Sequence, residues 1–150
     1  MRFYLDTSVF GGYYDDKFQV DTRMLFAGIE KGEMLVVMSE LTVKELFRAP
    51  KEVQELLDLI PTGKLDVIPI TDEMTVLAER YVKEGALTKK SISDAQHIAT
   101  ATMARVDVLV SWNFRHMVNF FRVRQYNSIN LRYGYPTIDI RSPREVLHEK

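Results

Sequence analysis

Three isolated carboxylates follow an expected strand or lie in an expected helix. Asp6 ends the β-rich run "RFYL", Glu45 lies inside "SELTVKELFRAP", and Asp94 lies inside "SISDAQHIAT". Within about 4 Å of one another, such groups would repel by roughly 4 kcal/mol per pair at an effective dielectric constant near 20, so a shared pocket requires protons or cations. Carboxylate oxygens in an open site favour Mg²⁺ or Mn²⁺. The three acids therefore predict a divalent-metal site if the fold brings them together.

Each carboxylate also has an ordinary structural explanation. Asp6, which precedes "TS", can cap a turn by accepting backbone N–H groups two residues further on. Glu45 can pair with Arg48 on an exposed helix face, which is worth roughly 0.2–0.5 kcal/mol. Asp94 in a first helical turn interacts favourably with the helix dipole by about 0.3–1 kcal/mol. Taken singly, none of the three acids indicates catalysis.

The composition is that of an ordinary globular protein. The chain has 150 residues, a net charge of −1, a hydrophobic fraction of 46% and no cysteine. This predicts a single domain over residues 1–150 and excludes both a disulfide framework and a thiolate metal site. The N-terminal run is too short for a signal peptide, and no apolar run approaches the roughly 18 residues that span a bilayer. We expect a cytoplasmic protein that does not associate with membranes.

Charge is distributed unevenly along the chain. Up to Ala104 there are 12 Lys and Arg against 17 Asp and Glu, whereas from Arg105 onward there are 8 against 4. The basic part interleaves arginines with aromatic residues, namely Arg115, Arg122, Arg124, Arg132, Phe114, Phe120, Phe121, Tyr126 and Tyr133. Such a stretch can hold phosphates and stack bases, but a solvated surface around a few core aromatics explains the same composition.

Periodicity predicts alternating strands and helices. Strands are expected at residues 2–5, 34–38, 65–71, 107–112 and 136–140, and helices at 18–31, 40–48, 51–60, 72–85, from 91 onward and from 142 onward. Residues 6–14 are expected to form a loop. This order predicts a three-layer α/β/α sandwich with a central, mainly parallel sheet of four to five strands. Ligand sites in such sheets lie at the carboxyl ends of the strands, where Asp6, Ser111 and Asn113 stand.

Four motifs together resemble the PIN-domain family of metal-dependent ribonucleases. They are "YLDTSVFGG", "SELTVKELFRAP", "SISDAQHIATA" and "DVLVSWNFRHM", in that order, and "INLRYGYPTIDIRSPREVL" is similar to the tail of one PIN subgroup. The resemblance runs from Phe3 to about Leu147. It implies that Asp6, Glu45 and Asp94 match the first three acidic residues of the family site, which bind Mg²⁺ or Mn²⁺. The fourth acid varies in the family, and this chain has Asn113 there, with His116 three residues on.

Further residues are candidates to support this site or to bind RNA. Ser111 matches the hydroxyl residue that often precedes the fourth position, and Thr7 and Ser8 can add hydroxyls near the metal. His97 lies on the helix face of Asp94, where it either packs and supports the ligands or contacts the site directly. His116 is a phosphate contact, a weak ligand or an exposed residue. Phosphate contacts are expected from Arg115, Arg122 and Arg124. Trp112 closes an apolar strand, which favours the core over base stacking.

The resemblance implies an endoribonuclease that hydrolyses RNA phosphodiester bonds to leave a 5′-phosphate and a 3′-hydroxyl. It also implies the toxin of a type II toxin–antitoxin pair of the VapBC kind, with an antitoxin partner and a symmetric homodimer. Three carboxylates and one phosphate balance two divalent ions, so we expect one tightly bound ion without RNA. Asn113 and His116 in place of a fourth acid keep open a catalytically weakened or inactive RNA-binding or protein-binding module. A metal-dependent phosphatase or a DNA nuclease on the same fold is a further alternative.

Overall fold

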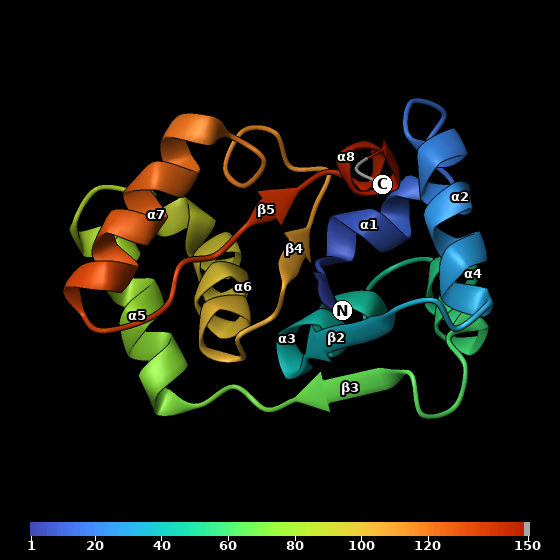
Figure 1. Ribbon diagram of the computed structural model, residues 1–150, viewed down its shortest axis with the longest axis horizontal. Helices are drawn as coiled ribbons and strands as arrows, with labels where there is room; N and C mark the ends of the chain where they lie inside the picture. Colours follow the sequence, from blue (N-terminus) through green and yellow to red (C-terminus); the bar gives the residue numbers. More distant parts are fainter. Residues whose placement is uncertain (149–150) are drawn as a thin grey trace.

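The computed structural model describes residues 1–148 and contains one five-stranded sheet. The strands are β1 (Arg2–Leu5), β2 (Leu35–Ser39), β3 (Leu65–Ile68), β4 (Val108–Val110) and β5 (Ile140–Arg141). All four pairings are parallel, and the spatial order is β3-β2-β1-β4-β5. Strand order therefore reverses between β1 and β4. The predicted three-layer α/β/α fold with a mainly parallel sheet is confirmed (Figure 1).

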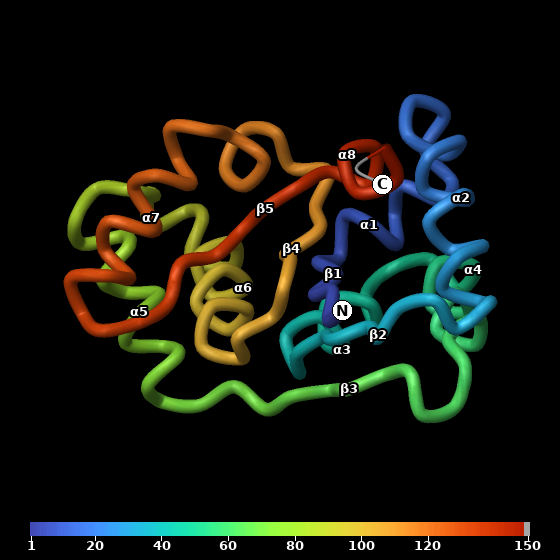
Figure 2. The backbone as a smooth tube through the Cα atoms, viewed as in Figure 1, coloured from blue at the N-terminus to red at the C-terminus, as the bar shows by residue number. Residues whose placement is uncertain are grey.

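Helices cover both faces of this sheet. They are α1 (Thr7–Gly12), α2 (Gln19–Glu30), α3 (Glu40–Phe47), α4 (Lys51–Gln54), a 3₁₀ turn (Glu55–Leu59), α5 (Asp72–Lys83), a second 3₁₀ turn (Lys89–Ser91), α6 (Ile92–Met103), α7 (Phe120–Arg132) and α8 (Pro143–His148). Successive strand residues alternate between two cores: Tyr4 packs with α5, α6 and α7, whereas Leu5 packs with α1 to α4. Figure 2 shows these two groups on opposite sides of the strands. Among residues 1–148, no helix has the length and apolarity needed to cross a bilayer.

Three segments differ from the sequence-based prediction. Residues 7–12, predicted as a loop, form α1 in spite of their two glycines, because a short turn of helix follows directly from β1. The helix α7 was not predicted at all. Its buried residues are only Tyr126, Ile129 and Asn130, and the arginines and polar residues between them hide the helical period. The predicted strand at 136–140 is also wrong in extent, since only Ile140 and Arg141 pair with β4.

The close contact between α1 and Trp112 explains why position 12 is a glycine. The Trp112 ring is 7% exposed, stacks on Phe18 with centroids 4.2 Å apart, and donates from Nε1 to Thr22 Oγ1 at 2.9 Å. Trp112 therefore belongs to the core. A Cβ at Gly12 would lie 2.7 Å from Trp112 Nε1 and 2.8 Å from Thr22 Oγ1, distances that require these side chains to shift.

Gly12→Ala is accordingly expected to lower the free energy of unfolding by about 1–3 kcal/mol, because it overpacks this contact. The matched control is Gly11→Ala in the same helix, where an added Cβ meets no atom within 4 Å. The control should be neutral or slightly stabilising, since Ala is the better helix former. Urea unfolding followed by tryptophan fluorescence measures both. Equal stability of the two variants would contradict this account of Gly12.

Candidate active site

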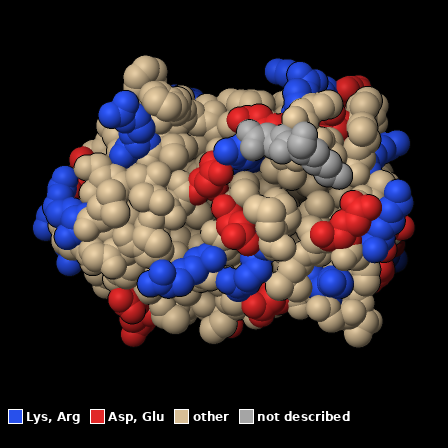
Figure 3. Space-filling view, in the orientation of Figure 1, with Lys and Arg blue, Asp and Glu red and all other residues tan. Residues whose placement is uncertain are grey.

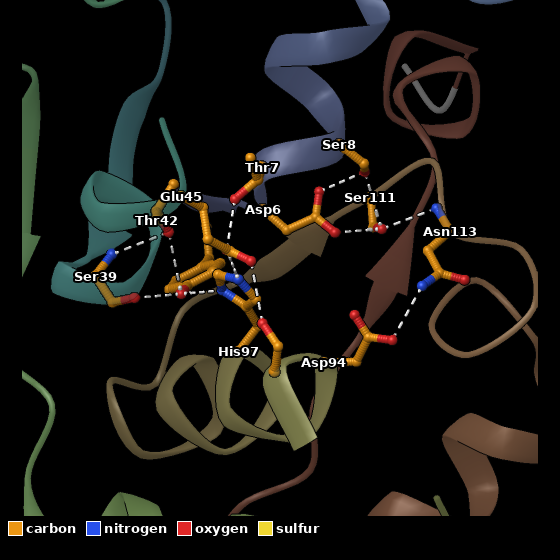
Figure 4. A network of polar contacts seen from close by, with 12 residues as sticks. Asp6, Thr7, Ser8, Ser39, Thr42, Glu45, Asp94, His97, Ser111 and Asn113 are labelled. Carbon is orange, nitrogen blue, oxygen red and sulfur yellow. Dashed lines mark hydrogen bonds and ion pairs between the residues drawn. The ribbon is translucent and has the colours of Figure 1, made fainter. Parts of the chain in front are cut away.

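The three predicted acids lie around the point where strand order reverses. Asp6 directly follows β1, Glu45 extends from α3, and Asp94 stands in the first turn of α6. Residues 111–113 follow β4, the neighbour of β1. Figure 4 shows that these side chains approach one another from four separate elements. This is the edge of a parallel sheet at which ligand sites are expected.

Asp6 is the most enclosed of the three acids. Its residue is 4% exposed, and its two carboxylate oxygens accept hydrogen bonds from Ser8 Oγ and Ser111 Oγ, each at 2.6 Å. The side chain makes no capping hydrogen bond to α1, so the capping explanation for Asp6 is wrong. Burial raises the pKa of Asp6, although the charge of His97 and the two hydroxyl groups act in the opposite direction. The protein thus keeps a carboxylate where the charged form is costly.

Glu45 is held by three side chains from two other elements, α1 and α6. Thr7 Oγ1 donates to Oε1 at 2.7 Å, Ser93 Oγ donates to Oε2 at 3.1 Å, and His97 Nε2 lies 2.6 Å from Oε1. Burial alone would raise the pKa of Glu45, but the hydrogen bonds from His97 and Thr7 outweigh it and lower this pKa to about 2. The strongest contacts of Glu45 therefore reach across to α1 and α6 instead of along its own helix.

His97 links Glu45 to the core beneath the site. The residue is 3% exposed, and its Nδ1 lies 2.7 Å from the hydroxyl of Tyr4, which in turn lies 2.8 Å from Ser39 Oγ. This chain of contacts orients the imidazole so that Nε2 faces the carboxylate. His97 is therefore packed inside the protein and supports a predicted site residue, which agrees with the first of the two expectations from the sequence.

Asp94 faces the loop that follows β4. Asn113 Nδ2 donates to Asp94 Oδ2 at 3.3 Å, and His116 Nδ1 lies 3.3 Å from the same oxygen. Burial raises the pKa of Asp94, opposed mainly by the charges of His116 and His97. Asn113 Oδ1 meanwhile accepts the backbone N–H groups of Arg115 at 3.1 Å and His116 at 2.9 Å.

These contacts explain the amide at position 113. Both lone pairs of the Asn113 carbonyl oxygen are used inside the loop, and its NH₂ group points to Asp94. A carboxylate at this position could accept the same backbone hydrogen bonds, but it would repel Asp94 instead of donating to it. Asn113 therefore lowers the negative charge of this region while keeping the loop geometry.

His116 is partly enclosed by its neighbours. Its side chain is 19% exposed, and Nδ1 lies 3.0 Å from Ser91 Oγ as well as near Asp94. The reading of His116 as a plainly exposed residue is wrong. Ser91 and Asp94 have the S-x-x-D spacing that is typical of a helix cap, but the Ser91 side chain makes no capping hydrogen bond to α6.

Among the three arginines proposed for phosphate contact, Arg122 is already engaged. Its Nη1 donates to the carbonyl oxygen of Ala86 at 2.7 Å, which fastens α7 to the segment between α5 and α6. Arg115 and Arg124 are exposed.

Two residues that contact the candidate site were not predicted from the sequence. Tyr4 has the pattern of a core strand residue, and Ser93 stands next to the more conspicuous Asp94. The alternation in β1 puts Tyr4 on one face of the sheet, but only the fold reveals that His97 lies there.

The donor set fits a hard divalent cation in its chemistry. Carboxylate and hydroxyl oxygens predominate around Asp6, the charge of Asp94 raises the pKa of Asp6, and the charge of Glu45 raises that of Asp94. A cation would relieve this mutual repulsion. Within residues 1–148, no three His, Cys, Asp or Glu side chains lie close enough together to hold one ion, and serine, asparagine and histidine side chains partner the carboxylates.

Solved structures with a similar fold include several toxins. The toxin VapC20 of Mycobacterium tuberculosis, described as cleaving the sarcin-ricin loop, is 13% identical with a TM-score of 0.59, covering 91% of this chain and 98% of its own. FitAcB of Neisseria gonorrhoeae is 16% identical with a TM-score of 0.60 and covers 95% and 98%. A toxin–antitoxin complex from Klebsiella pneumoniae is 19% identical with a TM-score of 0.54 and covers 75% and 88%. At these identities the likeness shows the fold alone.

No curated protein sequence matches the chain significantly. The family model described as "PIN domain", in contrast, matches residues 3–115. This range begins in β1 and ends in the loop after β4, so it includes Asp6, Glu45, Asp94 and Asn113. Together with the confirmed α/β/α fold, this match means that the chain belongs to the PIN domain family.

Proposed function

We propose that this protein is a metal-dependent endoribonuclease and the toxin of a type II toxin–antitoxin pair. The observation that supports the proposal is the position of Asp6, Glu45 and Asp94, from three separate elements, around the strand-order reversal of a PIN domain, where the charge of Asp94 raises the pKa of Asp6 and that of Glu45 raises the pKa of Asp94. PIN domains are generally nucleases. The similar structures include a toxin described as cleaving the sarcin-ricin loop and a toxin–antitoxin complex, which supports a toxin function and an antitoxin partner here.

The three acids would hold Mg²⁺ or Mn²⁺. The positive charge of such an ion would stabilise negative charge on a phosphodiester oxygen and lower the pKa of an attacking water. Each acid is positioned by its own partners. Ser8 and Ser111 fix the Asp6 carboxylate, and His97 fixes that of Glu45. Asn113, the fourth residue of the proposed catalytic set, orients Asp94 through its amide. This chain therefore has three acids and one neutral positioning residue.

The substrate and partners follow from the same proposal. Arg115 and Arg124 are exposed and would contact RNA phosphates, while His116 beside Asp94 would meet a phosphate at the edge of the site. A cytoplasmic location and a homodimer accompany the toxin function.

The competing candidate is an inactive RNA-binding or protein-binding module, which the neutral Asn113 favours. RNA cleavage by the purified protein distinguishes the nuclease from such a binding module.

The purified protein is expected to cleave single-stranded RNA in Mg²⁺ or Mn²⁺ and to stop when EDTA is added. Asp94→Asn should reduce the cleavage rate at least about tenfold, because it removes one ligand charge from the site. Asp72→Asn is a matched control, since Asp72 is an exposed acid in the first turn of another helix. Calorimetry without RNA should detect one tightly bound Mn²⁺ per chain in the parent protein.

Cleavage that survives EDTA, or an Asp94→Asn variant as active as Asp72→Asn, would exclude the proposed site. Loss of activity together with loss of folding would be recognised by circular dichroism. DNA of the same sequence, offered in parallel, distinguishes a ribonuclease from a DNA nuclease on the same fold.

A further inference from the structure

Two exposed phenylalanines begin α7 without entering either core. Phe120 is 68% exposed and Phe121 is 76% exposed, and the two rings contact each other edge to face with centroids 5.6 Å apart. Phenylalanine exposed to this extent leaves a large apolar area in water. Neither ring is needed to hold α7, whose buried residues begin at Tyr126.

These rings stand close to the candidate active site. Phe120 follows His116 by four residues, so the chain between them spans at most roughly 14 Å. The connection is compact, because the backbone N–H groups of Met117 and Val118 both donate to the Asn113 carbonyl. Arg122 fastens the same turn of α7 to Ala86. Phe120 and Phe121 therefore lie at the start of α7, directly after the loop that positions Asn113 and His116.

The surroundings of this pair carry positive charge. From Val108 to Ile138 the sequence contains no Asp or Glu, but it contains Arg115, Arg122, Arg124 and Arg132. The Arg124 guanidinium lies 5.7 Å from the Phe120 ring centre. On the face in Figure 3, the half formed by α5, α6 and α7 is mostly uncharged, with Lys and Arg at its upper, left and lower edges and a few Asp and Glu among them. Aromatic rings beside arginines complement a single-stranded polyanion, because bases stack on the rings while phosphates meet the cations.

Other aromatic residues of this region already pack against or bond to other residues of the protein. The Trp112 ring stacks on Phe18, and Phe114 packs against both at centroid distances of 6.2 Å and 6.0 Å. Tyr126 is buried, and the Tyr133 hydroxyl donates to Glu84 at 2.9 Å. Phe120 and Phe121 are thus the aromatic pair near the site whose faces are most exposed.

We propose that Phe120 and Phe121, together with Arg124, form a platform that stacks unpaired bases of RNA beside the active site and selects single-stranded over duplex RNA. Duplex RNA keeps its bases stacked on one another and cannot use such a platform, whereas loops and single strands can. This inference rests on the proposed ribonuclease function for its substrate. Its own prediction is one of binding, which is measured without cleavage.

The test is fluorescence anisotropy with a labelled oligouridylate and with an RNA duplex of equal length, at low salt and in EDTA. The double variant F120L/F121L keeps apolar side chains but removes the rings. It should bind the single strand about 5-fold to 100-fold more weakly, while its weaker duplex binding stays near that of the parent. F120Y/F121Y should restore single-strand binding. Leu131→Ala is the control, because Leu131 is 63% exposed on the same helix, about 16 Å further along its axis.

Single-strand affinity of F120L/F121L equal to that of the parent would overturn the platform. A changed oligomeric state in light scattering, with RNA affinity intact, would assign the pair to a protein contact and overturn it as well. The two proposals also fail separately. A parent protein that binds single strands through these rings but does not cleave them refutes the nuclease alone. A parent that cleaves RNA but loses nothing in F120L/F121L refutes the platform alone.

Discussion

Asp6→Asn is expected to reduce metal-dependent RNA cleavage by at least about 100-fold while leaving the fold intact. Asp6 is the most buried acid of the site, and its carboxylate can balance a divalent charge that a neutral amide cannot. The amide retains one oxygen to accept from Ser8 or Ser111 and an NH₂ group to donate to the other hydroxyl. The side-chain volume is therefore kept and one of the two hydrogen bonds reverses its direction, so the loss of charge is the main change.

The same substitution separates activity from stability. Because burial raises the pKa of Asp6, the charged carboxylate costs folding free energy when no cation is present. In EDTA, Asp6→Asn should therefore unfold at the same temperature as the parent or a higher one, whereas stabilisation by added Mn²⁺ should disappear. Asp16→Asn, at an exposed acid outside the site, is the control. A fully active Asp6→Asn variant that is still stabilised by Mn²⁺ would remove Asp6 from the proposed site.

The sequence predicts the layered fold better than the bounds of its individual elements. Asp6, Glu45 and Asp94 became candidates because each follows a strand or lies in a neighbouring helix, and because the motif order resembles a family. The helix α1 was missed since its two glycines disfavour a helix locally, and here the contact of Gly12 with Trp112 outweighs that propensity. The helix α7 was missed because tertiary contacts of three residues, and no continuous apolar stripe, attach it to the core.

Partners of the acids were the least predictable part. No spacing rule connects Tyr4 to His97 or Ser93 to Glu45, which are separated by 93 and 48 residues. Such contacts depend on which face of the sheet α6 covers. The arginines show a further limit of sequence-based prediction. Composition identifies the basic stretch, but only the structure shows that Arg122 is hydrogen-bonded to Ala86 whereas Arg124 is exposed.

His97→Ala is expected to lower both stability and catalysis, because His97 joins the site to the core. The substitution removes the imidazole between Tyr4 and Glu45 and leaves the buried Tyr4 hydroxyl with fewer partners. The cavity and the lost hydrogen bonds should together lower the free energy of unfolding by about 2–4 kcal/mol. Without its strongest hydrogen-bonding partner, Glu45 should also show a pKa above the present value of about 2, measurable by carbon NMR titration of the carboxyl group.

For catalysis, loss of a residue that orients a ligand typically costs about 10-fold to 100-fold in metal affinity or activity, so His97→Ala should lower kcat and Mn²⁺ affinity by this amount. Tyr4→Phe is the matched comparison, since it deletes the hydroxyl that meets Nδ1 but keeps the ring and the contact of Nε2 with Glu45. It should have the smaller effect on both quantities. If His97→Ala loses stability but binds Mn²⁺ and cleaves RNA like Tyr4→Phe, then His97 only fills the core, and Glu45 does not depend on it for its orientation.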